Sequence, residues 1–160
     1  MIRQHETGAV LVLLLSNFTI RIRWCGFYKM NSAINFTNAL LIGIGAALGA
    51  WSRWGLGIAF NTILPNLPLG TLIANLSGGF MMGLALGLIG MGSMESQSFR
   101  LFLTTGFLGG LTTFSAFTGE SLTLLQKHEY GWAACHVSSH VFGALLMAAS
   151  GFALVQYSRS

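Results

Sequence analysis

The chain has 160 residues, of which 53% are apolar and 8% are charged, against the roughly one-quarter charged residues typical of soluble domains. Long segments without any acidic or basic residue indicate an integral membrane protein with one small domain. The formal net charge of +4 does not predict a nucleic-acid partner, because half of the basic residues precede Met30 and the others form no basic stripe. The two cysteines form no disulfide framework.

The first 29 residues differ from the rest. They contain one short apolar run, at 8–15, flanked by Arg3, Arg21 and Arg23. That run is too short to span a bilayer and lacks a clear cleavage site, so it predicts neither an anchor nor a signal peptide. We expect residues 1–29 to be a mis-assigned upstream start or a disordered extension, with Met30 the natural start of a transmembrane domain over 30–160.

Four apolar segments follow, and each covers the roughly 20 residues that a spanning helix needs. They lie at about residues 38–60, 69–91, 99–125 and 131–155. Their short connections force neighbouring helices to be antiparallel. The sequence therefore predicts an all-α membrane protein of four transmembrane helices.

Glycines recur at four-residue spacing in these spans, a pattern that allows close helix contact in lipid. The glycines are Gly45 and Gly49, then Gly79, Gly83 and Gly87, then Gly106 and Gly110.

The third span contains its own break. Gly109 and Gly110, followed by Thr112 and Thr113, are poor helix formers. A helix that unwinds there frees backbone groups that lipid cannot satisfy, so such irregular backbone is tolerated only inside protein or beside a polar cavity. Broken membrane helices tend to mark ion or substrate sites. The segment predicts an ion site.

Polar side chains inside the other spans support this interpretation. Asn75 lies mid-way along the second span, where an amide indicates a bonded partner or a pathway, and Thr71 shares its helical face. The alternative role for Asn75 is to hold helices together. His136 and His140 share a face of the fourth span. Two histidines without a nearby carboxylate are too few for a metal site, but each can donate a hydrogen bond.

Two charged residues, Arg53 and Glu120, lie toward the ends of their spans, where they can snorkel or pair. The pathway thus offers hydrogen-bond donors, together with Phe114 and Phe117, whose ring edges carry partial positive charge. Donors and ring edges suit a small, strongly hydrated anion, whereas a cation route calls for carboxylates or rings of carbonyls.

The distribution of basic residues favours neither orientation of the chain in the membrane. Arg100 and Arg159 fall on one side of the four spans, and Arg53 and Lys127 on or near the other. A chain without bias can insert both ways and pair as an antiparallel homodimer. The alternative is a weakly biased monomer.

These motifs resemble the CrcB/Fluc fluoride channels over about residues 39–157. The resemblance rests on Arg53-Trp54, on Gly70-Thr71-Leu72 with Asn75, and above all on GFLGGLTTFSAF at 106–117. It implies a dual-topology homodimer in lipid with two antiparallel fluoride pores, in the plasma membrane of a prokaryote (the inner membrane if Gram-negative). It also implies a structural sodium ion at the dimer centre, held by the backbone carbonyls of Gly109 and Thr112.

The pore residues that the resemblance implies are Asn75 and the paired Phe114 and Phe117, with Thr113 and Glu120 on the polar side of the third span. At the places of His136 and His140, relatives often carry Tyr, Ser or Asn. Fluoride would leave the cytoplasm passively down its electrochemical gradient, which lowers its toxicity without any catalytic group.

Two other classes remain open at this point. A small dual-topology multidrug or cation exporter would want an acidic residue deep in a span. A membrane enzyme using Cys135, His136 and His140 would need an oriented acid–base or metal constellation.

Overall fold

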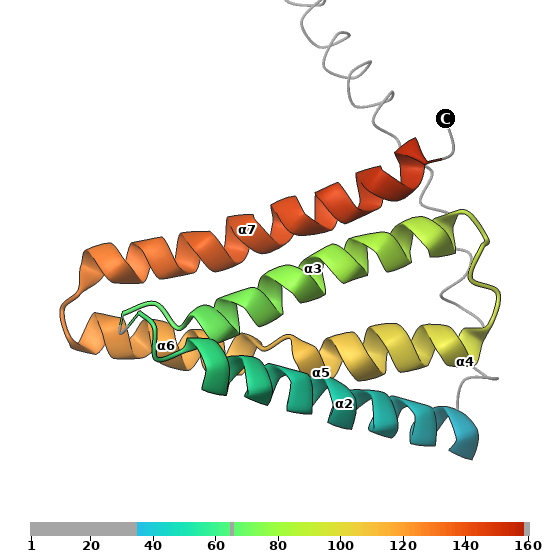
Figure 1. Cartoon of the computed structure of the whole chain (residues 1–160), viewed down its shortest axis with the longest axis horizontal. Coiled ribbons are helices and arrows are strands. Elements are labelled where there is room, and N and C mark those ends of the chain that lie inside the picture. Colours follow the sequence, from blue (N-terminus) through green and yellow to red (C-terminus); the bar gives the residue numbers. More distant parts are fainter. Residues whose placement is uncertain (1–34, 65, 159–160) are drawn as a thin grey trace, which may run out of the picture. The chain divides into compact units, whose positions relative to one another are not determined.

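The computed structural model describes residues 35–64 and 66–158; the expected 1–29 extension lies outside the described residues. Every regular element in this part of the chain is helical (Figure 1). Four helical segments are long and apolar enough to cross a membrane: Phe36–Phe60, Leu69–Gly90, Gln97–Gln126 and Tyr130–Tyr157. The predicted all-α fold of four spans is confirmed, with bounds within two residues of those expected.

The first two spans are joined through one asparagine. Helix α2 (Phe36–Phe60) begins after Asn35, whose side chain accepts a hydrogen bond from the Asn38 amide. It ends at Asn61, and the Oδ1 of Asn61 accepts from the amides of Gly70 and Thr71 at 2.8 and 3.3 Å. Asn61 thereby caps the first turn of α3 (Leu69–Gly90), whose amides have no partner within the helix.

The third span consists of several pieces. Helix α4 (Gln97–Arg100) continues into a wide π-helical stretch, η3 (Leu101–Leu108), and a last turn, α5 (Gly109–Leu111). Thr112 and Thr113 are extended, with φ,ψ of −78°,156° and −150°,121°, and α6 (Phe114–Gln126) follows. Figure 1 shows this short extended link between α5 and α6. The expected break in the third span is therefore present.

Within the predicted glycine–threonine stretch, the break lies at Thr112 and Thr113 and not at Gly109 and Gly110, although glycine has the lower helix propensity. Gly109 is helical, with φ −63° and ψ −35°. A Cβ on Gly110 would collide with the Ala46 backbone of α2, so this glycine permits close packing of a regular turn. Thr113 instead starts α6, because its Oγ1 accepts from the Ala116 amide at 3.2 Å.

Helix α7 (Tyr130–Tyr157) packs along α3, while α2 packs along η3 and α5 (Figure 1). The glycine pattern lies at these contacts. A Cβ on Gly79 would stand 2.8 Å from the Ala144 carbonyl, and one on Gly83 would collide with the Ala148 backbone. A Cβ on Gly106 would stand 2.8 Å from the Ile42 carbonyl of α2. Close approach of backbones, as predicted, joins these spans.

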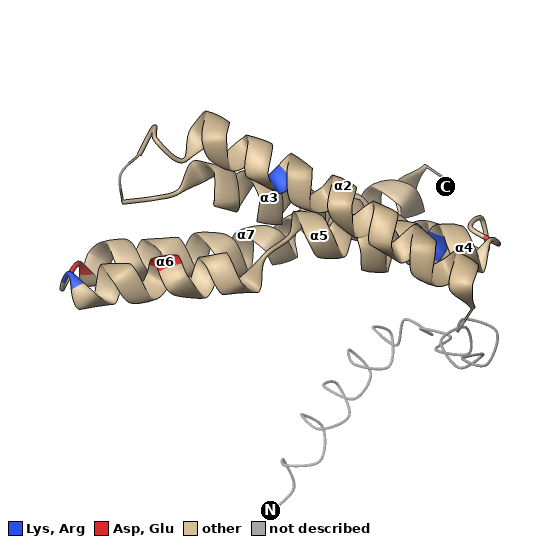
Figure 2. Ribbon diagram, turned by 90° about the horizontal axis from the view of Figure 1, so that it is seen from below, with Lys and Arg blue, Asp and Glu red and all other residues tan. Residues whose placement is uncertain are grey.

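Charge is sparse on the helices (Figure 2). Of the charged residues in the described ranges, Arg53 and Glu120 lie within a span, seven residues before the end of Phe36–Phe60 and six before the end of Gln97–Gln126, toward the ends of their spans as expected. Glu95, Arg100, Lys127 and Glu129 lie in or beside the connections. A continuous apolar stripe covers the outer side of α2. Its exposed members are Phe36, Leu40, Ile44, Leu48, Trp51, Trp54 and Ile58. A surface of this composition faces lipid or another apolar chain.

Candidate ion pathway

The break in the third span is held by Asn75 of α3. Its Oδ1 accepts from the Thr113 amide at 2.8 Å, and its Nδ2 donates to the Thr113 carbonyl at 3.1 Å. In an unbroken helix the Thr113 amide would bond to the Gly109 carbonyl. The side chain of Asn75 therefore replaces backbone partners that lipid cannot supply.

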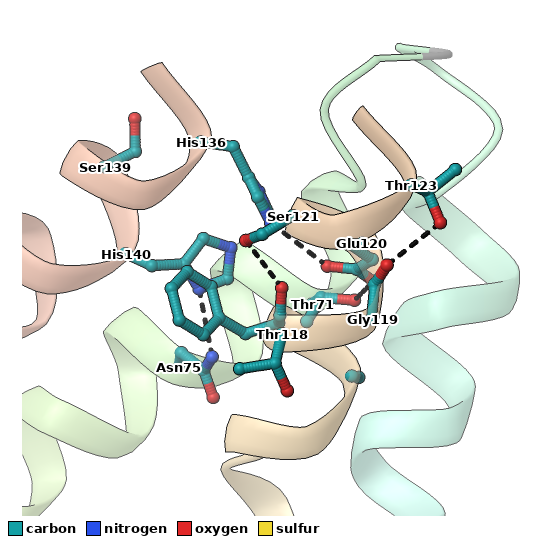
Figure 3. Close-up of polar contacts among 12 residues, drawn as sticks. Thr71, Asn75, Thr118, Gly119, Glu120, Ser121, Thr123, His136, Ser139 and His140 are labelled. Carbon is teal, nitrogen blue, oxygen red and sulfur yellow. Dashed lines mark hydrogen bonds and ion pairs between the residues drawn. The ribbon is translucent and has the colours of Figure 1, made fainter. Parts of the chain in front are cut away.

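Asn75 also contacts the fourth span. Its Nδ2 lies 3.0 Å from Nδ1 of His140 on α7 (Figure 3). Both the helix-joining role and the pathway role that the sequence left open are thus compatible with its contacts, since one amide joins α3, the break and α7. One hydrogen of Nδ2 is donated to the Thr113 carbonyl, and the other lies within reach of His140 Nδ1, whose role depends on the tautomer of that ring.

A second polar group lies beside the first. Thr71 Oγ1 donates to Glu120 Oε1 at 2.7 Å, and Glu120 Oε2 lies 3.4 Å from His136 Nε2 (Figure 3). The two histidines are buried, with 0% and 4% of their surfaces exposed. Their ring centroids are 4.5 Å apart. Thr71, Glu120, His136 and His140 thus form one polar cluster between α3, α6 and α7.

The cluster corrects one sequence-based expectation. The histidine pair was expected to have no carboxylate nearby, but Glu120 lies next to it, and one ligand atom from each of the three residues lies within 4.8 Å of the others. The spacing of the residues predicts this contact, because Glu120 and His136 are each eight residues from His128 in the α6–α7 turn. In an antiparallel hairpin, residues equidistant from the turn face each other.

Several atoms of the cluster are buried without a hydrogen-bond partner among the described residues. They are Glu120 Oε2, both ring nitrogens of His136 and Nε2 of His140. Buried polar atoms in proteins are nearly always bonded to protein or to ordered water. The cluster is therefore equipped to bind something small and polar.

The paired phenylalanines adjoin this cluster. Their ring centroids are 5.4 Å apart, and the Phe117 ring lies 5.4 Å from His136 and 5.0 Å from His140. Phe117 is 8% exposed, whereas Phe114 is 76% exposed on the single chain. Phe117 therefore lines the polar cluster, and Phe114 extends the aromatic surface outward.

A pocket of about 360 Å³ opens beside the break. Its lining includes Arg53, Trp54, Thr71, Thr113 and Glu120. Thr71 and Glu120 thus belong both to the pocket wall and to the buried cluster. Arg53 donates from Nε to the Gly110 carbonyl at 3.2 Å, so it pairs with the backbone of α5.

The Gly109 and Thr112 carbonyls, expected to hold sodium, lose their regular helical partners. In a regular helix the amides of Thr113 and Ala116 would donate to these two carbonyls. Here the Thr113 amide donates to Asn75 Oδ1, and the Ala116 amide donates to Thr113 Oγ1. Backbone oxygens released in this way suit a hard cation.

Two polar contacts were not predicted from the sequence: the Asn61 cap of α3 and the hydrogen bond from Ser98 Oγ to Asn38 Oδ1 at 2.7 Å.

Comparison with known proteins agrees with this architecture. The model of the family "CrcB-like protein, Camphor Resistance (CrcB)" matches residues 40–152. A protein of Aromatoleum aromaticum named "Fluoride-specific ion channel FluC" is 52% identical over 124 residues, which cover 78% of this chain and 95% of the relative. A relative of the same name from Cupriavidus pinatubonensis is 53% identical over 69% of this chain and 87% of its own length. Another, from Pseudomonas putida, is 49% identical over 71% of this chain and 90% of its own length. This chain, a multi-pass membrane protein with four spanning helices, therefore belongs to the CrcB family.

Proposed function

We propose that this protein is a fluoride-specific ion channel, through which cytoplasmic fluoride leaves passively down its electrochemical gradient. The observation that carries the proposal is the meeting of Asn75, His140 and Phe117 beside the break in the third span. The names of the relatives at about 50% identity support the same function, and they favour a channel over a cation exporter. Transport of this kind uses no catalytic group.

The residues proposed to line the pathway are Thr71, Asn75, Thr113, Phe114, Phe117, His136 and His140. Fluoride is small and strongly hydrated, so it crosses an apolar region only where other groups replace its water. Hydroxyl, amide and imidazole donors and the positive edges of the Phe114 and Phe117 rings are such groups. One oxygen of Glu120 accepts a hydrogen bond from Thr71, which disperses part of the negative charge that the anion meets, and the other lies 3.4 Å from His136 Nε2.

The proposed assembly is an antiparallel, dual-topology homodimer in the membrane. The even distribution of Lys and Arg after Met30 supports insertion in both orientations. The exposed ring of Phe114 and the apolar stripe of α2 offer surface for a second copy. In such a dimer Phe114 would be covered and would join the pathway that Phe117 already lines.

A sodium ion at the dimer centre is proposed as a structural cofactor, held by the backbone carbonyls of Gly109 and Thr112. The extended Thr112 and the diversion of the Thr113 amide support this role. The proposed location is the plasma membrane of a prokaryote, or the inner membrane if the cell is Gram-negative; bacterial relatives support it.

The test is flux from liposomes that hold the purified protein. Fluoride should leave electrogenically when a potassium ionophore balances its charge, and chloride should leave far more slowly. Protein-free liposomes are the control for leakage of hydrogen fluoride. Equal rates for chloride and fluoride would contradict a fluoride-specific channel.

A further inference from the structure

The amide of Asn75 has one possible orientation. Thr113 presents an amide donor at 2.8 Å from Oδ1 and a carbonyl acceptor at 3.1 Å from Nδ2. Turning the amide round would set donor against donor and acceptor against acceptor, and both bonds to the break would be lost. The backbone of Thr113 therefore determines that Nδ2, and not Oδ1, lies 3.0 Å from Nδ1 of His140.

This orientation decides where the proton of His140 sits. The amide nitrogen of Asn75 can only donate, so Nδ1 of His140 must accept, and a neutral imidazole then carries its hydrogen on Nε2. We propose that Asn75, held by Thr113, keeps His140 in the Nε2–H tautomer, so that His140 presents a hydrogen-bond donor to an anion and no unprotonated Nε2 to a metal. The proposal rests on the proposed fluoride pathway and names the residue that sets its charge preference.

The Nε2 atom of His140 is suited to receive the anion. It is buried and has no hydrogen-bond partner among the described residues. The ring of Phe117 lies 5.0 Å from the imidazole, centre to centre. An N–H beside an aromatic ring, both shielded from water, offers fluoride a donor at a point where it has shed part of its hydration shell.

The proton on Nε2 of His140 also disfavours metal binding. Two histidines and a glutamate with ligand atoms within 4.8 Å of one another are a common zinc-binding set. A neutral histidine binds metal through its unprotonated nitrogen and usually donates its other N–H to an acceptor. At His140 the unprotonated nitrogen faces Asn75, which offers a donor where a metal site needs an acceptor.

The direct test is ¹⁵N NMR of the purified wild-type protein labelled at histidine. The Nδ1 signal of His140 should have the shift of an unprotonated nitrogen and the Nε2 signal that of a protonated one, and fluoride should move the Nε2–H signal. His140→Gln identifies the signals by removing them, and His128, exposed in the α6–α7 turn, is the internal reference. A proton on Nδ1 of His140 would overturn the proposal even if the protein conducts fluoride.

A second test reverses the preference. Aspartate in place of Asn75 can accept from Nδ1–H and leaves Nε2 free for a metal, so Asn75→Asp should bind zinc roughly 10- to 100-fold more tightly than wild type in calorimetry without fluoride. The double variant Asn75→Asp with His140→Gln should lose that gain. Equal zinc affinity in wild type and Asn75→Asp, or a gain that persists without His140, would contradict the proposal. If Asn75→Asp does not fold, the wild-type NMR measurement decides. Absence of fluoride flux with the Nε2–H tautomer present would instead contradict the proposed function.

Discussion

Glu120 of α6 and His136 of α7 face each other across the last helical hairpin, with 3.4 Å between Oε2 and Nε2. The other carboxylate oxygen accepts the hydroxyl hydrogen of Thr71 from α3. One acidic side chain therefore ties three helices together beside a buried histidine pair. In the proposed anion pathway, one carboxylate oxygen is engaged by the Thr71 hydroxyl, and the other lies beside His136.

Replacing Phe117 or Phe114 with isoleucine should slow fluoride flux. Isoleucine keeps the site apolar but removes the positive ring edge. A loss on the scale of an aromatic contact, about 0.5–1.5 kcal/mol, corresponds to roughly a two- to tenfold fall in rate. Liposome efflux measures it. The matched control is Phe142→Ile, since Phe142 is an exposed ring on α7 outside the cluster. Wild-type flux in both pathway variants would refute the aromatic contribution.

Thr71→Val should destabilise the protein by about 1–3 kcal/mol, because a part-buried carboxylate oxygen of Glu120 loses its donor. Thr71→Ser retains the hydroxyl and should be milder. Thermal unfolding in detergent compares them. The control is Thr123→Val, whose hydroxyl bonds only to Gly119 of its own helix. Equal effects of Val and Ser at position 71 would show that the hydroxyl is unimportant.

Gly83→Ala should separate α3 from α7, because the added Cβ collides with the Ala148 backbone. Overpacking of this kind costs about 1–3 kcal/mol, and thermal unfolding in detergent would detect it. Gly55→Ala is the control, since a Cβ there meets nothing within 4 Å, and alanine at that helical position should be neutral or slightly stabilising. A Gly83→Ala protein as stable as Gly55→Ala would disprove close backbone contact.

Three lysines added after α7 should bias insertion to one side, because unmodified chains carry no net Lys/Arg preference after Met30. Antiparallel pairing should weaken accordingly. Labelling of a cysteine placed at the carboxyl terminus, from each side of the membrane in turn, measures orientation. Labelling of the unmodified chain from a single side would exclude dual topology.

Thr112→Pro should disturb the proposed sodium site, because proline removes the bond from the Thr112 amide to the Leu108 carbonyl and disfavours the helical conformation of Leu111. Thr112→Ser should be mild, since the backbone carbonyl is the proposed ligand. Sodium-dependent thermal stability in detergent compares the two. Fluoride flux driven by a sodium gradient would contradict a purely structural ion.

Part of the site follows from the order of residues alone. The helical period predicts that residues four apart share a face, as Thr71 does with Asn75 and His136 with His140. The exact position of the break does not, because Gly109, Gly110, Thr112 and Thr113 are all poor helix formers. The bonds from Asn75 to the Thr113 backbone move the extended link beyond the glycines, and those bonds depend on a helix that lies 38 residues away in sequence.

The sequence by itself determined the membrane class, the four spans and the glycine faces, because transfer into lipid and close backbone approach depend on which residues follow one another along a helix. Only the tertiary structure decided which polar atoms meet. The contacts of Asn75 with His140 and of Glu120 with His136 join different helices at hydrogen-bonding or near-bonding distance. Such contacts depend on the rotation and depth of each helix to within about one ångström, and an apolar pattern does not specify these.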